Sequence, residues 1–120
     1  MNTDKELLEN AAKSIGMTLR YNYLGGRDAN QPWNPLDDDG DAFRLAAALN
    51  ICVVHDEPIM IAVHEYNGYS EGEYERGVEA WIVDKYDAST IEFAEIYGDD
   101  KDKATRLAIV KVAAEIGKKL

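Results

Sequence analysis

The chain has 120 residues and a formal net charge of −10 at pH 7, and its hydrophobic and charged fractions, 46% and 30%, are those of a folded globular protein. This length predicts a single domain, residues 1–120, with one core that needs neither disulfides nor a metal. The single cysteine, Cys52, excludes an internal disulfide, and its apolar neighbours predict a buried, unreactive thiol in a reducing compartment. The acidic N-terminal segment lacks the long apolar run of a signal peptide or a membrane span, so a cytoplasmic location is predicted.

The negative charge is concentrated in one part of the chain. Residues 56–100 contain 13 acidic and two basic side chains, a net charge of −11, whereas the remainder contains 10 acidic and 11 basic ones. Phosphate backbones and anionic lipids repel such a surface, so neither direct nucleic-acid binding nor membrane binding is expected. A basic protein surface is a suitable partner. The competing interpretation is that the surplus carboxylates only keep the domain soluble.

The first part of the chain predicts a helix followed by a strand. Thr3 and Glu6 match a capping box at a helix start, apolar residues then recur at helical spacing, and Gly16 is placed to end the helix in a left-handed conformation. From Thr18 to Leu24 the pattern changes to period two, which is typical of a half-buried strand. Residues 25–31 predict a turn and a short return segment.

The stretch from Trp33 to Ala46 is the most distinctive part of the sequence. It combines an aromatic residue, a proline, four aspartates around a glycine and the beginning of a nearly wholly apolar helix. Pro35 disfavours helical angles at Asn34, so any secondary-structure element before it should end there. The residues with an expected structural role are Trp33, Asn34, Pro35, Asp38, Asp39, Gly40, Asp41 and Arg44.

The helix within this stretch has a predictable start. Asp38 or Asp39 is placed to cap a helix that begins near Gly40, and the helix dipole favours the carboxylate of Asp41 in the first turn. Beyond that turn Arg44 is the only charged residue of the helix. We therefore expect it to be the least exposed helix of the protein.

The second half of the chain predicts strands. Apolar runs at residues 51–54 and 59–63 are separated by Asp56, Glu57 and Pro58, an interruption that predicts an antiparallel hairpin. Runs at residues 78–83 and 90–97 predict two further strands. Neither face of the 59–64 strand is plainly polar, which predicts a sheet that is covered on both sides.

The end of the chain predicts a third helix. Aspartates precede it, lysines follow it, and Gly117 is placed to stop it. Together the elements predict an α+β domain with three helices and a mostly antiparallel sheet of four to five strands.

The central stretch also resembles a known signature. The run Trp33-Asn34-Pro35-Leu36, followed by Asp38-Asp39-Gly40-Asp41-Ala42 and Arg44-Leu45-Ala46, is similar to the signature of a family of small uncharacterised proteins of tailed bacteriophages and prophages. The segments Ala11-Ala12-Lys13 and Ala113-Ala114-Glu115-Ile116-Gly117 resemble that family's first and last helices. The resemblance implies an alpha-beta-alpha sandwich. It implies no reaction, because the family has no assigned activity.

The aspartates of the central stretch invite comparison with a calcium-binding loop. Asp37, Asp39 and Gly40 match the third, fifth and sixth positions of that loop. However, Pro35 and Ala46 occupy its first and twelfth positions, where the loop requires oxygen ligands. We therefore interpret the aspartates as helix caps, with a looser metal site over Asp37–Asp41 as the alternative.

Two histidines, His55 and His64, are the remaining candidates for chemistry. Acidic residues flank both, and they are expected on neighbouring strands, but their spacing matches no established ligand or acid–base motif. Accordingly no catalytic residue, cofactor or metal is predicted. The alternative function is a small metal-dependent enzyme that uses the Asp37–Asp41 cluster or the histidine pair.

The first functional hypothesis is a phage or prophage accessory protein that acts by protein–protein interaction. Its sharpest version is an acidic inhibitor of a host nucleic-acid-binding or defence protein. Residues 67–77, with three glycines, predict an exposed loop, and the tyrosines in and beside it offer large contact area at low entropic cost. The partner is a host or phage protein, and self-association is left open. The predicted partner-binding residues are Tyr66, Tyr69, Glu71, Glu73, Tyr74 and Glu75.

Overall fold

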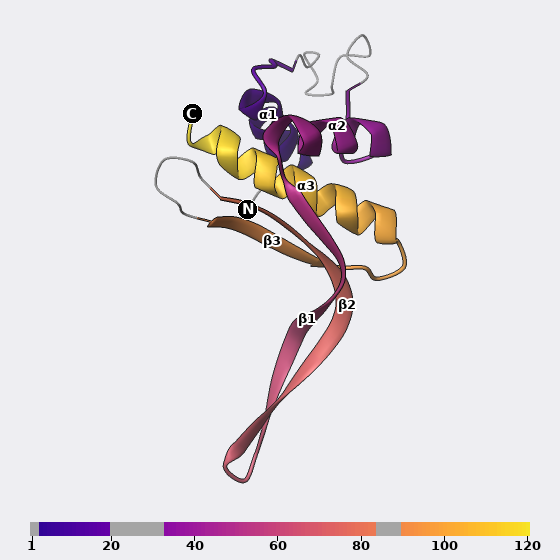
Figure 1. Cartoon of the computed structure of the whole chain (residues 1–120), viewed down its shortest axis with the longest axis vertical. Helices are drawn as coiled ribbons and strands as arrows, with labels where there is room; N and C mark the ends of the chain where they lie inside the picture. The colour runs from indigo at the N-terminus through magenta and orange to yellow at the C-terminus, as the bar shows by residue number, and fades with distance from the viewer. Residues whose placement is uncertain (1–2, 20–32, 84–89) are drawn as a thin grey trace.

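In a computed structural model of the chain, described over residues 3–19, 33–83 and 90–120, three helices pack on one face of an antiparallel sheet (Figure 1). Helix α3 lies on the sheet, and α1 and α2 pack on the other side of α3. This arrangement confirms the α+β class. The helices are α1 (Asp4–Ser14), α2 (Asp39–Leu49) and α3 (Lys101–Lys118), and the strands, in spatial order, are β1 (Cys52–Tyr66), β2 (Tyr69–Val83) and β3 (Thr90–Ile96).

Helix α1 has the predicted ends. The hydroxyl oxygen of Thr3 accepts a hydrogen bond from the Glu6 backbone N–H at 3.2 Å. Gly16 follows the helix with a φ of 75°, and it is the left-handed residue expected there. The strand predicted from Thr18 to Leu24 lies largely outside the described residues, and the turn and return segment of residues 25–31 lie wholly outside them.

The expectation that α2 is the least exposed helix is wrong. Of its residues only Ala42, Leu45 and Ala46 are buried, and the side chain of Phe43 is 72% exposed. Helix α3 has eight buried residues, because it lies between the sheet and the other two helices. An apolar sequence therefore marked a helix that is covered on one side only.

Helix α3 begins as predicted but ends differently. The carboxylate of Asp100 accepts a hydrogen bond from the Lys103 N–H at 2.9 Å and caps the first turn. Gly117 does not stop the helix, which continues to Lys118. A Cβ atom at Gly117 would lie 1.8 Å from the backbone oxygen of Asn10, so this glycine permits the close approach of α1 and α3.

The hairpin turn predicted at Asp56–Pro58 is also wrong, and β1 runs straight through it. The pairing of β1 with β2 shifts by one residue there, and Asp56 adopts a φ of 60° as the extra residue of a β-bulge.

The turn is Asn67–Gly68, with φ values of 37° and 96°. The predicted loop over residues 67–77 is therefore wrong beyond these two residues, because the rest pairs with β1 as part of β2. Two consecutive residues with positive φ form the tight turn that suits a right-twisted hairpin, and β2 starts directly after it.

The sheet has three strands within the described residues, so the predicted four to five strands are not confirmed. The apolar runs are confirmed as strand: residues 52–54 and 59–63 lie in β1, residues 78–83 in β2 and residues 90–96 in β3. The predicted cover on both faces is not seen, since the described helices all lie on one face. Cys52, Trp81 and Glu92 occupy paired positions on the face turned away from α3. Cys52 is therefore exposed, and the predicted buried thiol is wrong.

The core lies between the inner face of the sheet and the helices. Its largest fully buried side chains include Leu45, Val78, Val110 and Val112. Trp33 is half-buried and packs against this core, as expected for an anchor of the central stretch. Within the described ranges, the chain has no helix of the length and apolar character needed to cross a membrane.

Candidate functional site

The most prominent feature outside the core is a hairpin arm, which we define as residues 57–76 of β1 and β2 (Figure 1). Strand β3 pairs with β2 only from Gly77 to Val83, so the arm is a two-stranded ribbon beyond the sheet. At about 3.3 Å per residue its reach is roughly 30 Å. The longest dimension of the molecule, 58 Å, reflects this projection. None of the buried core residues belongs to the arm.

The arm has two chemically different faces. Side chains of paired residues share a face, and successive side chains alternate. Glu71 and Glu73 therefore share a face with their partners His64 and Ala62. We call this the acidic face, and it comprises His64, Tyr66, Tyr69, Glu71, Glu73 and Glu75.

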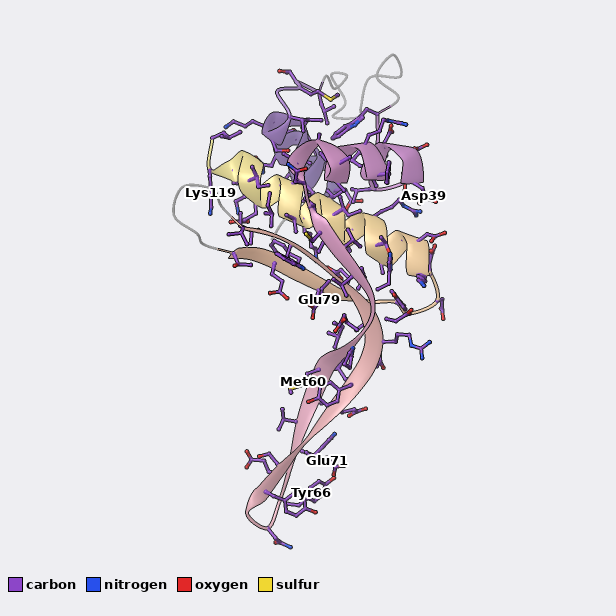
Figure 2. The ribbon with its side chains drawn as sticks, viewed as in Figure 1. Asp39, Met60, Tyr66, Glu71, Glu79 and Lys119 are labelled. Carbon is purple, nitrogen blue, oxygen red and sulfur yellow. The ribbon has the colours of Figure 1, made fainter. Side chains whose placement is uncertain are left out.

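The opposite face is apolar along the middle of the arm, where Met60 pairs with Tyr74 and Val63 with Gly72. Glu65 and Ser70 lie on the same face toward the tip, and Pro58 and Arg76 lie on it at the base. The side chains of Met60, Val63 and Tyr74 are 52%, 54% and 52% exposed. Figure 2 shows Met60 partway along the arm and Tyr66 near its tip, both far from the helices. Half-exposed apolar side chains on a projecting element contribute little to folding, so this face is available for contact.

Local contacts order the tip of the arm. The rings of Tyr66 and Tyr69 face each other across the turn with centroids 5.7 Å apart. Nε2 of His64 lies 2.8 Å from Oε2 of Glu73 across the two strands. These cross-strand pairs stabilise the ribbon where the body of the protein does not support it.

The structure thus brings together all six residues predicted to bind a partner, but it divides them between two faces. Tyr74 belongs to the apolar face, and the other five belong to the acidic face. Sequence reasoning missed Met60, Ile61 and Val63 as surface residues. The signal was the 59–64 strand without a polar face, which was interpreted as a covered sheet.

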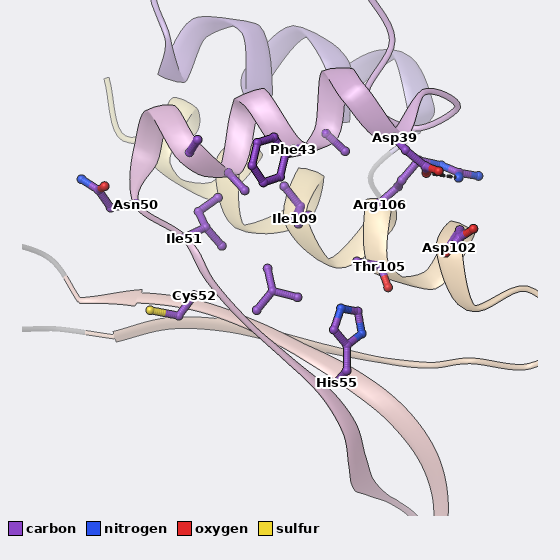
Figure 3. A pocket seen from close by; sticks show the side chains of 14 residues that line it. Asp39, Phe43, Asn50, Ile51, Cys52, His55, Asp102, Thr105, Arg106 and Ile109 are labelled. Carbon is purple, nitrogen blue, oxygen red and sulfur yellow. Dashed lines mark hydrogen bonds and ion pairs between the residues drawn. The ribbon is translucent and has the colours of Figure 1, made fainter.

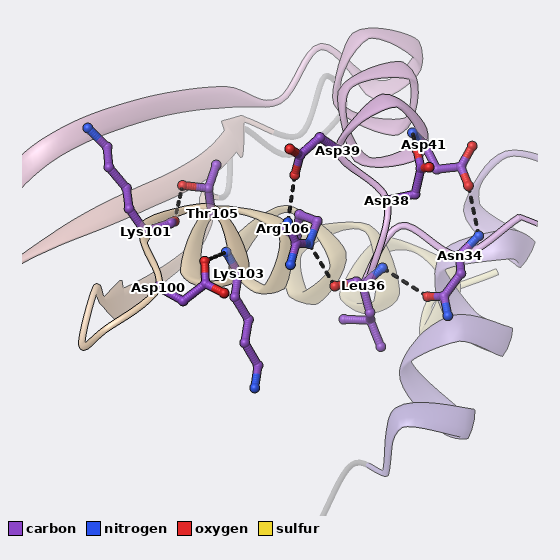
Figure 4. A network of polar contacts seen from close by, with 10 residues as sticks. All are labelled: Asn34, Leu36, Asp38, Asp39, Asp41, Asp100, Lys101, Lys103, Thr105 and Arg106. Atoms are coloured by element: carbon purple, nitrogen blue, oxygen red, sulfur yellow. Dashed lines mark hydrogen bonds and ion pairs between the residues drawn. The ribbon is translucent and has the colours of Figure 1, made fainter.

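The central stretch is the second candidate, and its aspartates have separate structural partners (Figure 4). Oδ1 of Asp38 accepts a hydrogen bond from the Asp41 N–H at 2.8 Å and caps α2. Oδ2 of Asp41 accepts one from the Asn34 N–H at 2.9 Å, and its Oδ1 pairs with Arg44 at 2.7 Å. Asp37 accepts a hydrogen bond from the Asn34 side chain at 3.0 Å.

Asp39 connects the central stretch to α3. Its Oδ1 lies 2.6 Å from Nη1 of Arg106, whose Nε donates to the backbone oxygen of Leu36 at 2.8 Å. The hydrogen bond with Asp39 raises the pKa of Arg106 above its ordinary value, although burial opposes the shift. Arg106 therefore joins α3 to the approach of α2. Sequence reasoning did not identify this residue, because its partners lie about 70 positions away in the chain.

The aspartates of the central stretch do not converge on one point. Asp38 caps α2, as the capping interpretation expects. Asp37 and Asp41 bond to Asn34 instead, and Asp39 pairs with Arg106. Among the described residues, no group of three or more histidine, cysteine or acidic side chains is arranged to hold a metal ion.

The two histidines do not form a pair. Both lie on β1, so nine residues, or roughly 30 Å of strand, separate them. The prediction that they lie on neighbouring strands is wrong. Nδ1 of His55 lies 3.3 Å from the hydroxyl of Tyr97, which also accepts the Asp56 N–H at 2.7 Å, whereas His64 contacts Glu73.

The third candidate is an open groove of about 690 Å³ between α2, α3 and β1 (Figure 3). Ala46, Ile51, Val53 and Ile109 line it, and the exposed ring of Phe43 borders it. Arg106 and Asp39 lie at one end but are already paired with each other. The lining of the groove is mainly apolar, and Asp102, Thr105 and His55 add polar groups to it. It is formed by α2 and the start of β1, which are consecutive in the chain, together with the distant α3, and no sequence pattern predicted it.

One carboxylate on the open face of the sheet is perturbed. Burial raises the pKa of Glu79 above its ordinary value, and the charge of Glu92, a hydrogen bond with Glu92 and the charge of Glu57 raise it further. Burial is the largest cause, and the like charges on the neighbouring strands add to it.

Comparisons of the chain with protein-family models, with curated proteins and with solved structures found no match. The resemblance of the central stretch to a phage protein family therefore stays a prediction.

Proposed function

We propose that the protein is a protein-interaction module and that the hairpin arm is its contact surface. The observation that carries this proposal is the half-exposed apolar set Met60, Val63 and Tyr74 on an element that supplies no residue to the core. Apolar side chains gathered on a projecting surface are typical of interaction sites. In this proposal the protein has no enzymatic activity of its own.

The acidic face supports a more specific version of the proposal. Glu71, Glu73 and Glu75 alternate along one face of β2, so neighbouring carboxylates are about 7 Å apart along the strand. A linear carboxylate array attracts a basic surface and competes with phosphates for it. The proposed partner is therefore a basic host protein, such as a nucleic-acid-binding or defence protein, met in the host cytoplasm by a phage or prophage accessory protein.

The resemblance to the phage family implies an alpha-beta-alpha sandwich, and the sequence pattern predicts four to five strands for its sheet. What supports it is the sequence pattern of Thr18–Leu24, which would supply a fourth strand. An experimental structure that covers this segment tests it directly.

The central experiment removes the arm and keeps the body. Glu57 and Gly77 are paired across the hairpin, so residues 58–76 can be replaced by a two-residue Asn-Gly turn. We expect the armless variant to keep its helical circular dichroism and its cooperative melting, because the core is untouched. We expect it to lose the proteins that the parent captures from host lysate.

A charge-matched pair of variants isolates the acidic face. Three Glu→Gln changes at positions 71, 73 and 75 should weaken capture and reduce its sensitivity to salt, because part of the attraction is between exposed charges. The control removes three carboxylates elsewhere on the surface, by Glu9→Gln, Asp99→Asn and Glu115→Gln. Equal capture by the parent and the armless variant would refute the proposal.

A further inference from the structure

The arm has one strand edge that the rest of the fold leaves open. The Tyr97 N–H donates to the Arg76 backbone oxygen at 3.0 Å, and the pairing of β3 with β2 ends at Gly77. From Tyr69 to Glu75 no described strand pairs with β2 on the side opposite β1. The edge of β2 therefore continues beyond β3 as a free edge.

The register identifies the backbone groups on this free edge. In an antiparallel strand the N–H and C=O of one residue point to the same side, and this side alternates along the strand. The Arg76 oxygen points to the side of β3. The two shifts in register insert extra residues in β1 only, so the alternation along β2 is unbroken. The N–H and C=O groups of Ser70, Gly72 and Tyr74 consequently point away from β1.

The two edges of the arm differ in how they are protected. Strand β1 carries Pro58, which has no N–H, and extra residues at Asp56 and Ile61 that bulge the strand. Proline and bulges are the devices by which proteins prevent an edge from pairing. Strand β2 contains neither between Tyr69 and Glu75. Pairing is blocked on one side of the arm and left open on the other.

The side chains beside the open edge specify what could pair with it. Glu71, Glu73 and Glu75 project to one face, while Gly72 and Tyr74 lie on the other. The ring of Tyr74 leans over Gly72, so that a Cβ there would lie 2.7 Å from the tyrosine hydroxyl. A strand added at this edge would therefore place every second side chain against carboxylates and the others against Gly72 and the ring of Tyr74, with Ser70 and Arg76 at the two ends of that surface.

We infer that the free edge of β2 accepts an extended segment of the partner protein as an additional strand, with basic residues at alternate positions and apolar residues between them. The backbone groups of Ser70, Gly72 and Tyr74 supply the ladder, and the glutamates select the basic residues. This inference rests on the proposed function, because it names the chemistry and the binding mode of the partner at the same arm.

The test uses the full-length protein and a synthetic eight-residue peptide of alternating lysine and valine with blocked ends. Two control peptides have the same composition. In one the lysines are clustered, and in the other alternate backbone amides are N-methylated, so that its charge is kept and its ladder is lost. Binding is measured by titration calorimetry. Amide hydrogen exchange, followed by NMR, reports on residues 69–76.

The alternating peptide should bind at least tenfold more tightly than either control and should slow exchange at Ser70, Gly72 and Tyr74. Two variants sharpen the test. Ser70→Pro removes one N–H from the free edge while the ladder to β1 is kept, and it should weaken binding. The triple Glu→Gln variant at positions 71, 73 and 75 should weaken binding and reduce its dependence on salt.

Two results would overturn the inference. One is equal binding of all three peptides without amide protection, which would show a purely electrostatic contact. The other is no binding of the alternating peptide, or protection at β1 instead of β2. Neither result bears on whether the arm is the contact surface, because the armless variant decides that question separately.

Discussion

Replacing Arg106 with methionine tests whether the central stretch is a structural joint. The Arg106 side chain is only 15% exposed, and its guanidinium donates to Leu36 through Nε and pairs with Asp39 through Nη1. Methionine keeps much of the apolar stem and removes both interactions. A hydrogen bond from a charged group contributes about 1.5–3 kcal/mol, and an exposed ion pair less than about 1 kcal/mol.

Because the Asp39 side chain is 69% exposed, its ion pair with Arg106 contributes little to stability. Most of the lost stabilisation should come from the hydrogen bond to the Leu36 backbone oxygen. We therefore expect Arg106→Met to lower the free energy of unfolding by about 2–3 kcal/mol and Asp39→Asn by less than about 1 kcal/mol. The double variant should show a coupling of about 0.5–1 kcal/mol. Urea unfolding followed by far-ultraviolet circular dichroism measures all three.

Arg44→Met is the matched control. Arg44 also pairs with an aspartate of the central stretch, but its side chain is 70% exposed and its partner is three positions away on the same helix. It should cost less than about 0.5 kcal/mol. If Arg106→Met and Arg44→Met destabilise the protein equally, the joint between α3 and the central stretch does not exist as described.

Three further predictions follow from single contacts. Asp38→Ala should cost about 1 kcal/mol through loss of the α2 cap, and millimolar calcium or magnesium should not raise the melting temperature of the parent; a metal-induced rise that Asp38→Ala abolishes would support a metal site instead. Gly117→Ala should lower the free energy of unfolding by about 1–3 kcal/mol in the urea titration, because its Cβ would collide with the Asn10 backbone. The control, Gly72→Ala, should lower it by less, because the new Cβ meets only the movable Tyr74 ring. Glu79 has a raised pKa when folded, so the folded state holds its proton more tightly and stability falls as pH rises through the range between the ordinary and the raised pKa. Glu79→Gln should therefore raise the melting temperature at pH 7, with a gain that disappears at acidic pH.

Local sequence determined where each helix starts. Thr3, Asp38 and Asp100 were predicted at or beside the helix starts, and each accepts the capping hydrogen bond in the structure. A cap satisfies an amide three residues away, so its physics is contained within one turn of chain. The left-handed conformation of Gly16 was predictable for the same reason, because it too depends on one turn of chain. The concentration of acidic residues in the second half is a property of the sequence itself.

The sequence contains two turn signals in the region of the hairpin. Asp56–Pro58 and residues 67–77 were both predicted to connect strands, and only Asn67–Gly68 does so. The six predicted partner-binding residues nevertheless belong to one element, because composition located them correctly along the chain. Their division between two faces depends on register with β1, which is a pairing between strands and not a property of either strand alone.

Burial was decided only by the tertiary structure. The apolar pattern of α2 predicted a covered helix, yet Phe43 is exposed, while α3, with more charged residues, is the element enclosed on several sides. Likewise Cys52 is exposed because its strand position turns it away from α3. The apolar pattern of a sequence indicates which surfaces favour burial. How fully each surface is buried depends on the packing of elements that are distant in the chain.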